Sequence, residues 1–400
     1  NKKVIKWISL IIFTTSISLF MDGYTFVMFF TFSFLCWLFL SLYRDFYLKK
    51  IILLEETFKK LMALLLSFSI PPILYNLYFP GVSTTSFPMD YYRTGGLDLS
   101  FLILPTEGTN LIGDLVGFST SRTLVEQFGD ESVYLSTYSF PLIILFIFSI
   151  FVFKKNKNPL IIFLIVLSFV SIYLSLGPSL KINSTKPNPQ ISQLMTEEYA
   201  LFSTGNEIIY QYFPGFKTMR VTFRWLAMFI FSSWTLVMIF LSSIKLKSKN
   251  ILQFIILTLL IISYLPDLPE RLNKQVINRN QLIELEEIFV PEIVKQVSSD
   301  EVVIFIPMNN DFAANFISAY GNFRSYNVGS DKSLDFASKY WPDRIKNIDK
   351  EFKDKISFDV ETVYKNLEEN EIIIVPYFSL YSPQYDYCFI YNYKNILFTP

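Results

Sequence analysis

Long apolar stretches fill the chain as far as Leu265 and constrain its fold more than any other feature. Seven of them run about Val4 to Phe20, Tyr24 to Tyr43, Leu61 to Phe79, Thr137 to Phe153, Leu160 to Leu176, Arg224 to Ile244 and Ile251 to Leu265. A helix of roughly 20 apolar residues crosses a hydrocarbon core about 30 Å thick and satisfies its own backbone hydrogen bonds there. Hydrophobic residues make up 52% of the sequence and charged residues 18%, a balance typical of membrane proteins. The sequence therefore predicts a multi-span α-helical membrane protein with about seven transmembrane helices.

Basic residues concentrate in alternate loops between these stretches. They are Lys2, Lys3 and Lys6, then Arg44, Lys49, Lys50, Lys59 and Lys60, then Lys154, Lys155 and Lys157, then Lys245, Lys247 and Lys249. Loops rich in lysine and arginine stay on the cytoplasmic side of a membrane. The long loops 80–136 and 177–223 and the segment 266–400 are therefore predicted to share the outer face. The basic clusters are interpreted as topology signals alone.

The hydrophobic periodicity changes after Leu265, which divides the chain into two predicted domains. Residues 1–265 form the transmembrane helical region, and residues 266–400 form an extracytoplasmic α/β domain of a multi-pass cell-membrane protein. Helices are predicted at Glu284–Val297 and Asp359–Leu367, and strands at Val302–Pro307, Ile372–Pro376 and Tyr387–Tyr391. Two of these strands are continuously apolar and end in proline, which is typical of central strands.

Several classes of function are excluded by what the composition lacks. The chain contains no histidine, so Ser-His-Asp chemistry and histidine-ligated metal sites are ruled out. Its formal net charge is zero, which provides no basic field for nucleic acid. No metal ligands and no cofactor motif are identified, so any cofactor is unknown, and a divalent metal ion is an open alternative that no motif supports. Cys36 and Cys388 lie in different predicted domains and are not expected to form a disulfide.

The sharpest local pattern is the run FPGFKTMRVTFRW from Phe213 to Trp225, where a turn precedes the sixth apolar stretch. Arg220 and Arg224 are four residues apart and would lie on one face of a helix. Two guanidinium groups at the membrane surface suit a phosphate or pyrophosphate of a lipid carrier, because arginine binds phosphate oxygens in pairs. Lys217 belongs to the same predicted site. The alternative is that these side chains snorkel and contact ordinary lipid headgroups at the end of a span.

This run, preceded by LSLGPSL at Leu174 to Leu180, resembles a signature of bacterial and archaeal membrane proteins related to the GT-C glycosyltransferases, including the YfhO-like group. The resemblance covers about Tyr24 to Pro307. It implies sugar transfer on the outer face from a polyprenyl-phosphate-linked donor to a glycan, lipid or protein acceptor, in the assembly of envelope glycans or glycolipids. The chain would be the C-terminal portion of such an enzyme, or of a non-catalytic relative.

The resemblance also implies roles for individual residues. In such enzymes an acidic residue in the first outer loop acts as general base on the acceptor hydroxyl, and that N-terminal catalytic part would be absent from this chain. Within the chain, Asp90 and Glu107 are the candidates for a catalytic carboxylate. Arg220, Arg224 and Lys217 would contact the carrier phosphate.

Two other classes of function remain open. A membrane-tethered binding or assembly protein would act through its outer domain, where loop residues such as Tyr340 and Trp341 could contact a sugar or peptide, or could be ordinary rim residues. A transporter of the lipid carrier would place ionisable or broken segments near the span centres. The spans contain little of this kind beyond Pro71 and Pro72, so transport is disfavoured.

Overall fold

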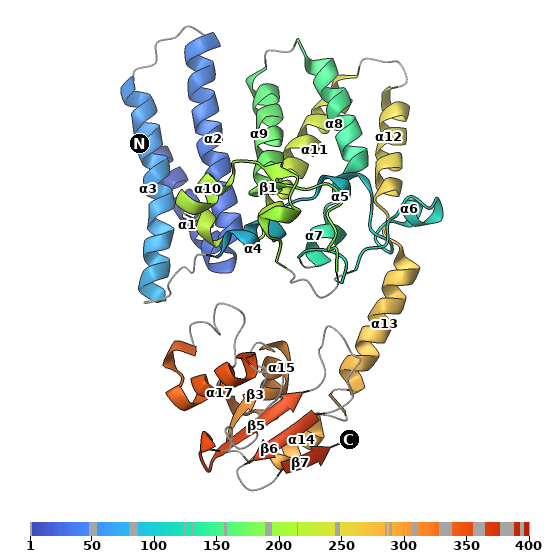
Figure 1. The fold of residues 1–400 in the computed structure, drawn as a ribbon. Helices are drawn as coiled ribbons and strands as arrows, with labels where there is room; N and C mark the ends of the chain where they lie inside the picture. Colours follow the sequence, from blue (N-terminus) through green and yellow to red (C-terminus); the bar gives the residue numbers. More distant parts are fainter. Residues whose placement is uncertain are drawn as a thin grey trace. The chain divides into compact units, whose positions relative to one another are not determined.

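The computed structural model describes residues 2–47, 54–79, 87–123, 125–129, 131–155, 158–188, 194–213, 215–244, 249–284, 286–287, 290–298, 300–305, 311–327, 338–354, 365–376, 388–392 and 396–399. The chain divides into two compact units, Asn1–Arg271 and Leu272–Pro400 (Figure 1). The division falls after Arg271, whereas the change of periodicity lies after Leu265.

The first unit is helical, and several of its helices have the length and apolar composition of membrane spans. Its long helices are α1 (Lys2–Met21), α2 (Gly23–Tyr47), α3 (Leu54–Tyr78), α8 (Phe140–Phe153), α9 (Pro159–Leu176), α11 (Leu226–Ser243) and α12 (Lys249–Ser263), and the boundary with the second unit falls inside α13 (Leu268–Glu284). Among the described residues, 5 segments are long and apolar enough to cross a membrane: Gly23–Tyr43, Phe58–Tyr78, Pro159–Leu176, Thr222–Ser243 and Asn250–Asn280. Lys6–Met21 and Phe140–Phe153 are apolar but shorter. Each predicted apolar stretch therefore coincides with a helix.

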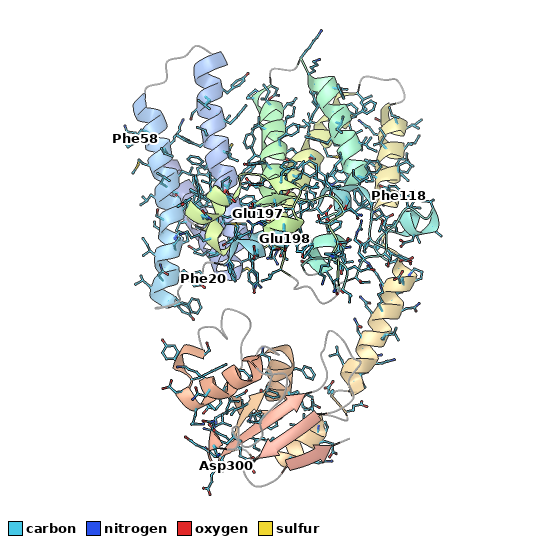
Figure 2. The ribbon with its side chains drawn as sticks, viewed as in Figure 1. Phe20, Phe58, Phe118, Glu197, Glu198 and Asp300 are labelled. Atoms are coloured by element: carbon cyan, nitrogen blue, oxygen red, sulfur yellow. The ribbon has the colours of Figure 1, made fainter. Side chains whose placement is uncertain are left out.

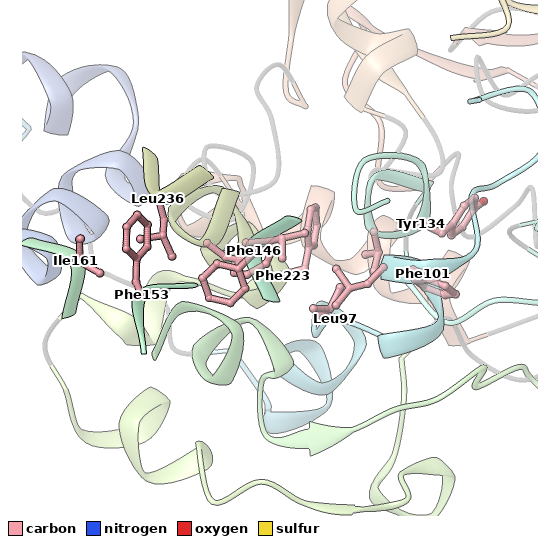
Figure 3. Close-up of a cluster of buried hydrophobic side chains, with 12 residues drawn as sticks. Leu97, Phe101, Tyr134, Phe146, Phe153, Ile161, Phe223 and Leu236 are labelled. Carbon is pink, nitrogen blue, oxygen red and sulfur yellow. The ribbon is translucent and has the colours of Figure 1, made fainter. Parts of the chain in front are cut away.

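Helices α8, α9 and α11 pack into the core of this unit (Figure 3). Phe146, Phe153, Ile161 and Leu236 are buried there, together with Leu97 and Phe223 from the loops. A polar contact between two of these helices is made by small side chains, since the hydroxyls of Ser168 and Ser232 lie 2.7 Å apart in the buried α9–α11 interface. Close approach of small residues is a common way for helices to associate in membranes.

The segments between the long helices form a layer, here called the loop layer, at one end of α8, α9 and α11 (Figure 1). Its elements are α4 (Met89–Thr94), α5 (Leu99–Ile103), α6 (Leu111–Leu115), α7 (Glu131–Leu135), β1 (Ser179–Leu180), η1 (Glu197–Tyr199), β2 (Phe202–Ser203), α10 (Glu207–Tyr212), η2 (Phe216–Thr218) and η3 (Thr222–Trp225). Strands β1 and β2 pair antiparallel. Residues from both long predicted loops thus meet in one place.

Backbone contacts at glycines join these segments. The N–H of Phe223 donates to the carbonyl of Gly95 at 2.8 Å. A Cβ atom added at Gly95 would lie 2.4 Å from the carbonyl oxygen of Arg220, and one added at Gly96 would lie 2.3 Å from that of Leu176. Only residues without a side chain allow backbones to approach this closely.

A buried lysine and a buried aspartate fix the same junction. The ammonium group of Lys181 donates to the carbonyls of Arg93 at 2.8 Å, Thr94 at 3.2 Å and Gly96 at 2.6 Å, where it satisfies acceptors at the C-terminal end of α4. The carboxylate of Asp98, which is 1% exposed, accepts hydrogen bonds from the backbone N–H groups of Asn183 and Ser184, which follow Lys181. Burial lowers the pKa of Lys181 to about 8, although the charge of Asp98 acts in the opposite direction.

We expect Lys181 to make stability depend on alkaline pH. Between about pH 8 and pH 10.5 the unfolded chain keeps a proton that the folded chain has lost, so the free energy of unfolding rises as pH increases through this window. The Lys181→Met variant lacks this contribution. Thermal unfolding of both proteins in detergent across the window should show a wild-type midpoint that rises relative to that of the variant. A constant difference between the two would contradict a lowered pKa.

Helix α3 contains Pro71 and Pro72. The sequence predicts that they kink the span or end its regular part, and the helix does not end there, because it continues from Leu54 to Tyr78 with both prolines inside it. Proline is tolerated inside membrane helices because neighbouring groups satisfy the freed carbonyls.

The second unit contains a five-stranded sheet with the order β4-β3-β5-β6-β7. The strands are β3 (Val302–Phe305), β4 (Arg324–Ser325), β5 (Glu371–Pro376), β6 (Cys388–Asn392) and β7 (Ile396–Thr399), and the helices are α14 (Val290–Gln296), α15 (Asp311–Gly321), η5 (Ser338–Tyr340) and α17 (Asp343–Asp354). Strand β3 pairs parallel with β4 and β5, and β5, β6 and β7 pair antiparallel. Most of the helix predicted at Asp359–Leu367 lies outside the described residues.

The core of this unit packs α14 and α15 against the sheet. Val290, Ile293, Val303, Phe305, Ala314, Ile317, Ile372 and Ile374 are buried there. At one sheet position the buried carboxylate of Glu371 accepts a hydrogen bond from the hydroxyl of Tyr326 at 2.7 Å and pairs with Arg344. The side chain of Trp341 donates to the carbonyl of Tyr326 at 2.9 Å. Trp341 therefore has a structural role in this unit.

Candidate functional site

The segment that carries the arginine pair is not the helix that the sequence predicts. Thr222–Trp225 forms the short 3₁₀ helix η3, and α11 begins only at Leu226. Val221, directly before η3, has a non-helical conformation with φ −100° and ψ 82°. Its N–H donates to the hydroxyl of Tyr24 at 3.1 Å, and the N–H of Phe223 donates to Gly95. Because these donors have partners on other segments, a regular helix does not start at Arg220.

Both arginines nevertheless come together around aromatic rings. The guanidinium carbon of Arg224 lies 4.4 Å from the ring centre of Tyr24, and that of Arg220 lies 5.4 Å from the ring centre of Phe87. The charges of both arginines act on Tyr24. Guanidinium groups are attracted to the faces of aromatic rings, which helps to hold these side chains in place. The structure therefore brings Arg220 and Arg224 together by way of Tyr24 rather than by helical spacing.

Lys217 lies on the same segment, in the 3₁₀ helix η2 (Phe216–Thr218) that precedes η3. Its side chain is exposed, as is that of Arg224, and Arg220 is half-buried. The hydroxyl of Tyr92 donates to the carbonyl of Lys217. Phe216 stacks on Trp225 with ring centres 5.3 Å apart, so the backbone that presents the three cations rests on a buried aromatic support.

Asp22 is a site residue that the sequence analysis missed. Its carboxylate accepts hydrogen bonds from the N–H of Tyr24 at 3.1 Å and from the N–H and hydroxyl of Thr25 at 3.0 and 2.6 Å, and so caps the N-terminus of α2. Burial opposes its ionisation, but these hydrogen bonds and the charge of Arg224 outweigh it, so the pKa of Asp22 lies below its ordinary value. An aspartate directly before an apolar stretch is a sequence signal for a helix N-cap, and it could have identified Asp22.

Asp90, the first predicted carboxylate, lies near the arginine pair but is already engaged. It forms an ion pair at 2.6 Å with Arg93, which also pairs with Glu197 at 3.2 Å. Arg93 is 8% exposed, and a buried guanidinium requires such a counter-charge. Asp90 is in helix α4, which begins two residues after Phe87. The geometry thus gives Asp90 a structural role in addition to its predicted one.

Glu107, the second predicted carboxylate, lies elsewhere in the loop layer. Its side chain is exposed, and its N–H donates to the carbonyl of Thr120 at 3.1 Å. The following residue, Gly108, lies against Glu270, since a Cβ atom there would be 2.6 Å from the carboxylate. Figure 2 shows the two regions apart, with Phe118 beside α12 and Glu197 near α10. The structure therefore does not bring Glu107 to the arginine pair.

Three acidic residues near Glu107 have oxygens that could hold a cation. The carboxylates of Asp114, Asp267 and Glu270 offer oxygens that all lie within 4.8 Å of one another, and all-oxygen sets suit Ca²⁺ or Mg²⁺. Their hydrogen bonds are local: Asp114 accepts from the N–H of Gly108 at 3.1 Å, and Asp267 accepts from the N–H of Glu270 at 3.2 Å. These contacts hold the 106–119 segment together and cap α13, and three acids alone do not define a metal site.

No protein-family model, no curated protein and no solved structure matches the chain. Its function is therefore inferred from the arginine site and from the motif that contains it.

Proposed function

We propose that the chain is part of a GT-C-like membrane glycosyltransferase, or of a non-catalytic relative, that binds a polyprenyl-phosphate-linked sugar on the outer face of the membrane. The observation that carries this proposal is the arrangement of Arg220 and Arg224 on Phe87 and Tyr24, with Lys217 exposed on the same segment of chain. Three cations at the end of apolar spans provide a binding place for the phosphate of an amphiphile. The acceptor is a glycan, lipid or protein of the cell envelope.

The proposed topology has seven spans, formed by the five long apolar segments and the two shorter ones. Loops 80–136 and 177–223 and the domain that follows the last span lie on the outer side. Two features support this arrangement. The basic loops alternate along the sequence, and segments of both long loops meet in one layer (Figure 1).

The proposed chemistry is a direct displacement at the anomeric carbon of the donor sugar. The acceptor hydroxyl oxygen bonds to that carbon, the carbon–oxygen bond to the phosphate breaks with its electron pair on the phosphate, and a carboxylate takes the hydroxyl proton. Arg220 and Arg224 stabilise the negative charge on the departing phosphate. Asp90 is nearer to them than Glu107 in the fold, although its pairing with Arg93 limits its freedom. A base upstream of this chain is the other source of the carboxylate.

We expect the Arg220→Ala and Arg224→Ala double variant to lose donor turnover. Each charge-assisted hydrogen bond contributes about 1.5–3 kcal/mol, so the loss of two should weaken the phosphate contact by at least ~100-fold. The measurement is release of polyprenyl phosphate from a radiolabelled polyprenyl-phosphate sugar by the full-length protein in membranes. The double Arg→Lys variant keeps the charge but loses the paired N–H geometry and should recover only part of the turnover.

The control for this experiment is Arg279→Ala, which removes an exposed arginine of α13 and should leave turnover unchanged. Equal turnover in the wild type and the double variant would remove the arginine pair from the mechanism. If folded full-length protein turns over no donor, the enzyme hypothesis is wrong.

The second candidate is a membrane-tethered binding or assembly protein. It is favoured by one observation, the independent buried core of the unit Leu272–Pro400. Binding of a glycan or protein partner by the full chain, together with absence of donor turnover, would select it. Transport of the lipid carrier is less favoured, because the described polar residues buried between α9 and α11 are serines such as Ser168 and Ser232 rather than charged groups.

A further inference from the structure

Four aromatic side chains gather where α1 and α3 end. The ring centre of Phe20 lies 5.4 Å from that of Tyr75, 5.9 Å from that of Tyr78 and 6.3 Å from that of Phe79. Tyr78 and Phe79 are 4.7 Å apart, and Tyr75 and Phe79 are 5.1 Å apart. This group, here called the aromatic cluster, is formed by residues that are far apart in the sequence.

The aromatic cluster is exposed rather than buried in the protein. Tyr78 is 71% exposed, Phe20 42% and Phe79 40%. Leaving apolar surface in water costs about 25 cal/mol per Å², so exposed rings of this size indicate a surrounding other than bulk water. Tyrosine has an apolar ring and a polar hydroxyl and is enriched at the level of lipid headgroups, where one end of the side chain is dry and the other wet.

The chain on either side of the aromatic cluster changes from apolar to polar. Within α3, Leu77 is 74% exposed and Leu74 43% exposed, and side chains of this kind suit contact with lipid tails. Two residues after Phe20 comes the ionised carboxylate of Asp22, whose pKa is lowered as described above. The aromatic cluster therefore lies at the boundary between the two kinds of sequence.

The other end of α3 provides an independent measure of the same boundary. Lys59 and Lys60 are exposed at the start of the apolar segment Phe58–Tyr78, and Figure 2 shows Phe58 and Phe20 at opposite ends of this group of helices. At 1.5 Å per residue, the helical distance from Lys60 to Tyr78 is about 27 Å, close to the hydrocarbon thickness of roughly 30 Å. The distance along α3 between Lys60 and the aromatic cluster is therefore close to the thickness of the hydrocarbon core.

We propose that the aromatic cluster lies in the headgroup region of the bilayer and sets the depth at which α1 and α3 cross it. Its partner is the lipid surface, which the rings contact at the level between acyl chains and phosphates. This inference does not depend on sugar transfer. It also places Asp22 and Tyr24 close to the same depth in the membrane, because they follow Phe20 by two and four residues.

The test measures depth with a spin label in the full chain reconstituted in phospholipid nanodiscs. Cys36→Ser and Cys388→Ser remove the natural thiols, and single cysteines then replace Leu77, Leu74 or Glu198, none of which belongs to the aromatic cluster. Collision rates with oxygen, which prefers the hydrocarbon, and with a water-soluble nickel chelate report depth. We expect the ratio of oxygen to nickel collisions to be highest at Leu74, several-fold lower at Leu77 and lowest at the exposed Glu198.

A second variant tests whether the rings themselves set this depth. Replacing Tyr78 and Phe79 with serine should change the collision ratio at Leu77 by at least twofold, whereas Tyr78→Trp should preserve it. A label at Leu77 that neither reagent reaches would show that protein, such as a second copy of the chain, covers this surface, and would overturn the proposal. An unchanged ratio in the double serine variant, or a ratio at Leu77 equal to that at Glu198, would also overturn it.

Discussion

Replacing Asp98 with alanine is expected to lower the free energy of unfolding of the first unit by about 3–5 kcal/mol, the range for breaking a buried charged network. Asp98 accepts hydrogen bonds from the N–H and hydroxyl of Ser100 at 2.9 and 2.7 Å, from the N–H of Asn183 at 2.8 Å and from the N–H of Ser184 at 2.9 Å. Alanine would leave these donors without their acceptor. Unsatisfied buried donors account for much of the expected loss.

The loss also involves the neighbouring cations. Asp98 is the acidic group whose charge acts on both Lys181 and Arg122, and these side chains are 3% and 7% exposed. Without Asp98 they would remain buried with less counter-charge. The Asp98→Asn variant keeps the shape and one acceptor oxygen, so it should fall between wild type and alanine.

The measurement is equilibrium unfolding in detergent, followed by tryptophan fluorescence. The matched control is Glu126→Ala, which removes an exposed carboxylate from the same loop layer and should change stability by less than about 0.5 kcal/mol. If Asp98→Ala and Glu126→Ala unfold alike, the network around Asp98 does not stabilise the fold.

Replacing Gly95 with alanine is expected to disrupt the arginine site and to destabilise the fold by several kcal/mol. The new methyl group would lie 2.4 Å from the carbonyl oxygen of Arg220 and 2.8 Å from the Cα atom of Val221. Both neighbours are backbone atoms, so no side-chain rotation relieves the overlap. Overpacking typically costs about 1–3 kcal/mol, and contacts with fixed backbone exceed this range.

Gly23 provides the matched control, because an added Cβ there meets nothing within 4 Å. Gly23→Ala should keep wild-type stability, whereas Gly95→Ala should lower the thermal midpoint and shift Arg220 away from Phe87. A photocrosslinking residue in place of Phe87 would report that shift as reduced labelling of the 220–224 segment. Normal stability and normal crosslinking in Gly95→Ala would show that the segments are not in contact at this point.

The apolar helices could be predicted from the sequence because each depends on a continuous local pattern. The same holds for β3 and β5, whose apolar runs are visible along the chain. Strand β4 consists only of Arg324 and Ser325, and a pair of residues has no periodicity to detect. Its place in the sheet is determined by pairing with Val302 and Val303, which are distant in sequence.

The site shows the same division between local and distant information. The arginine pair could be identified from residue type, but its support could not, because Tyr24 is 197 residues from the Val221 N–H that it accepts. Lys181 binds backbone carbonyls of residues 85 to 88 positions away, and carbonyls have no signature in a sequence. Asp90 was predicted from its charge alone. The structure shows that this charge forms an ion pair with the buried side chain of Arg93.

The hydrogen bond between Tyr24 and Val221 has a consequence for the order of synthesis. The chain emerges from its N-terminus, so Tyr24 and the Gly95 carbonyl are made long before Val221 and Phe223, which donate to them. Contacts this distant in sequence form late. During translation the hydroxyl of Tyr24 and the carbonyl of Gly95 are therefore without these donors until η3 has been synthesised, so the first three helices are complete well before this junction can form.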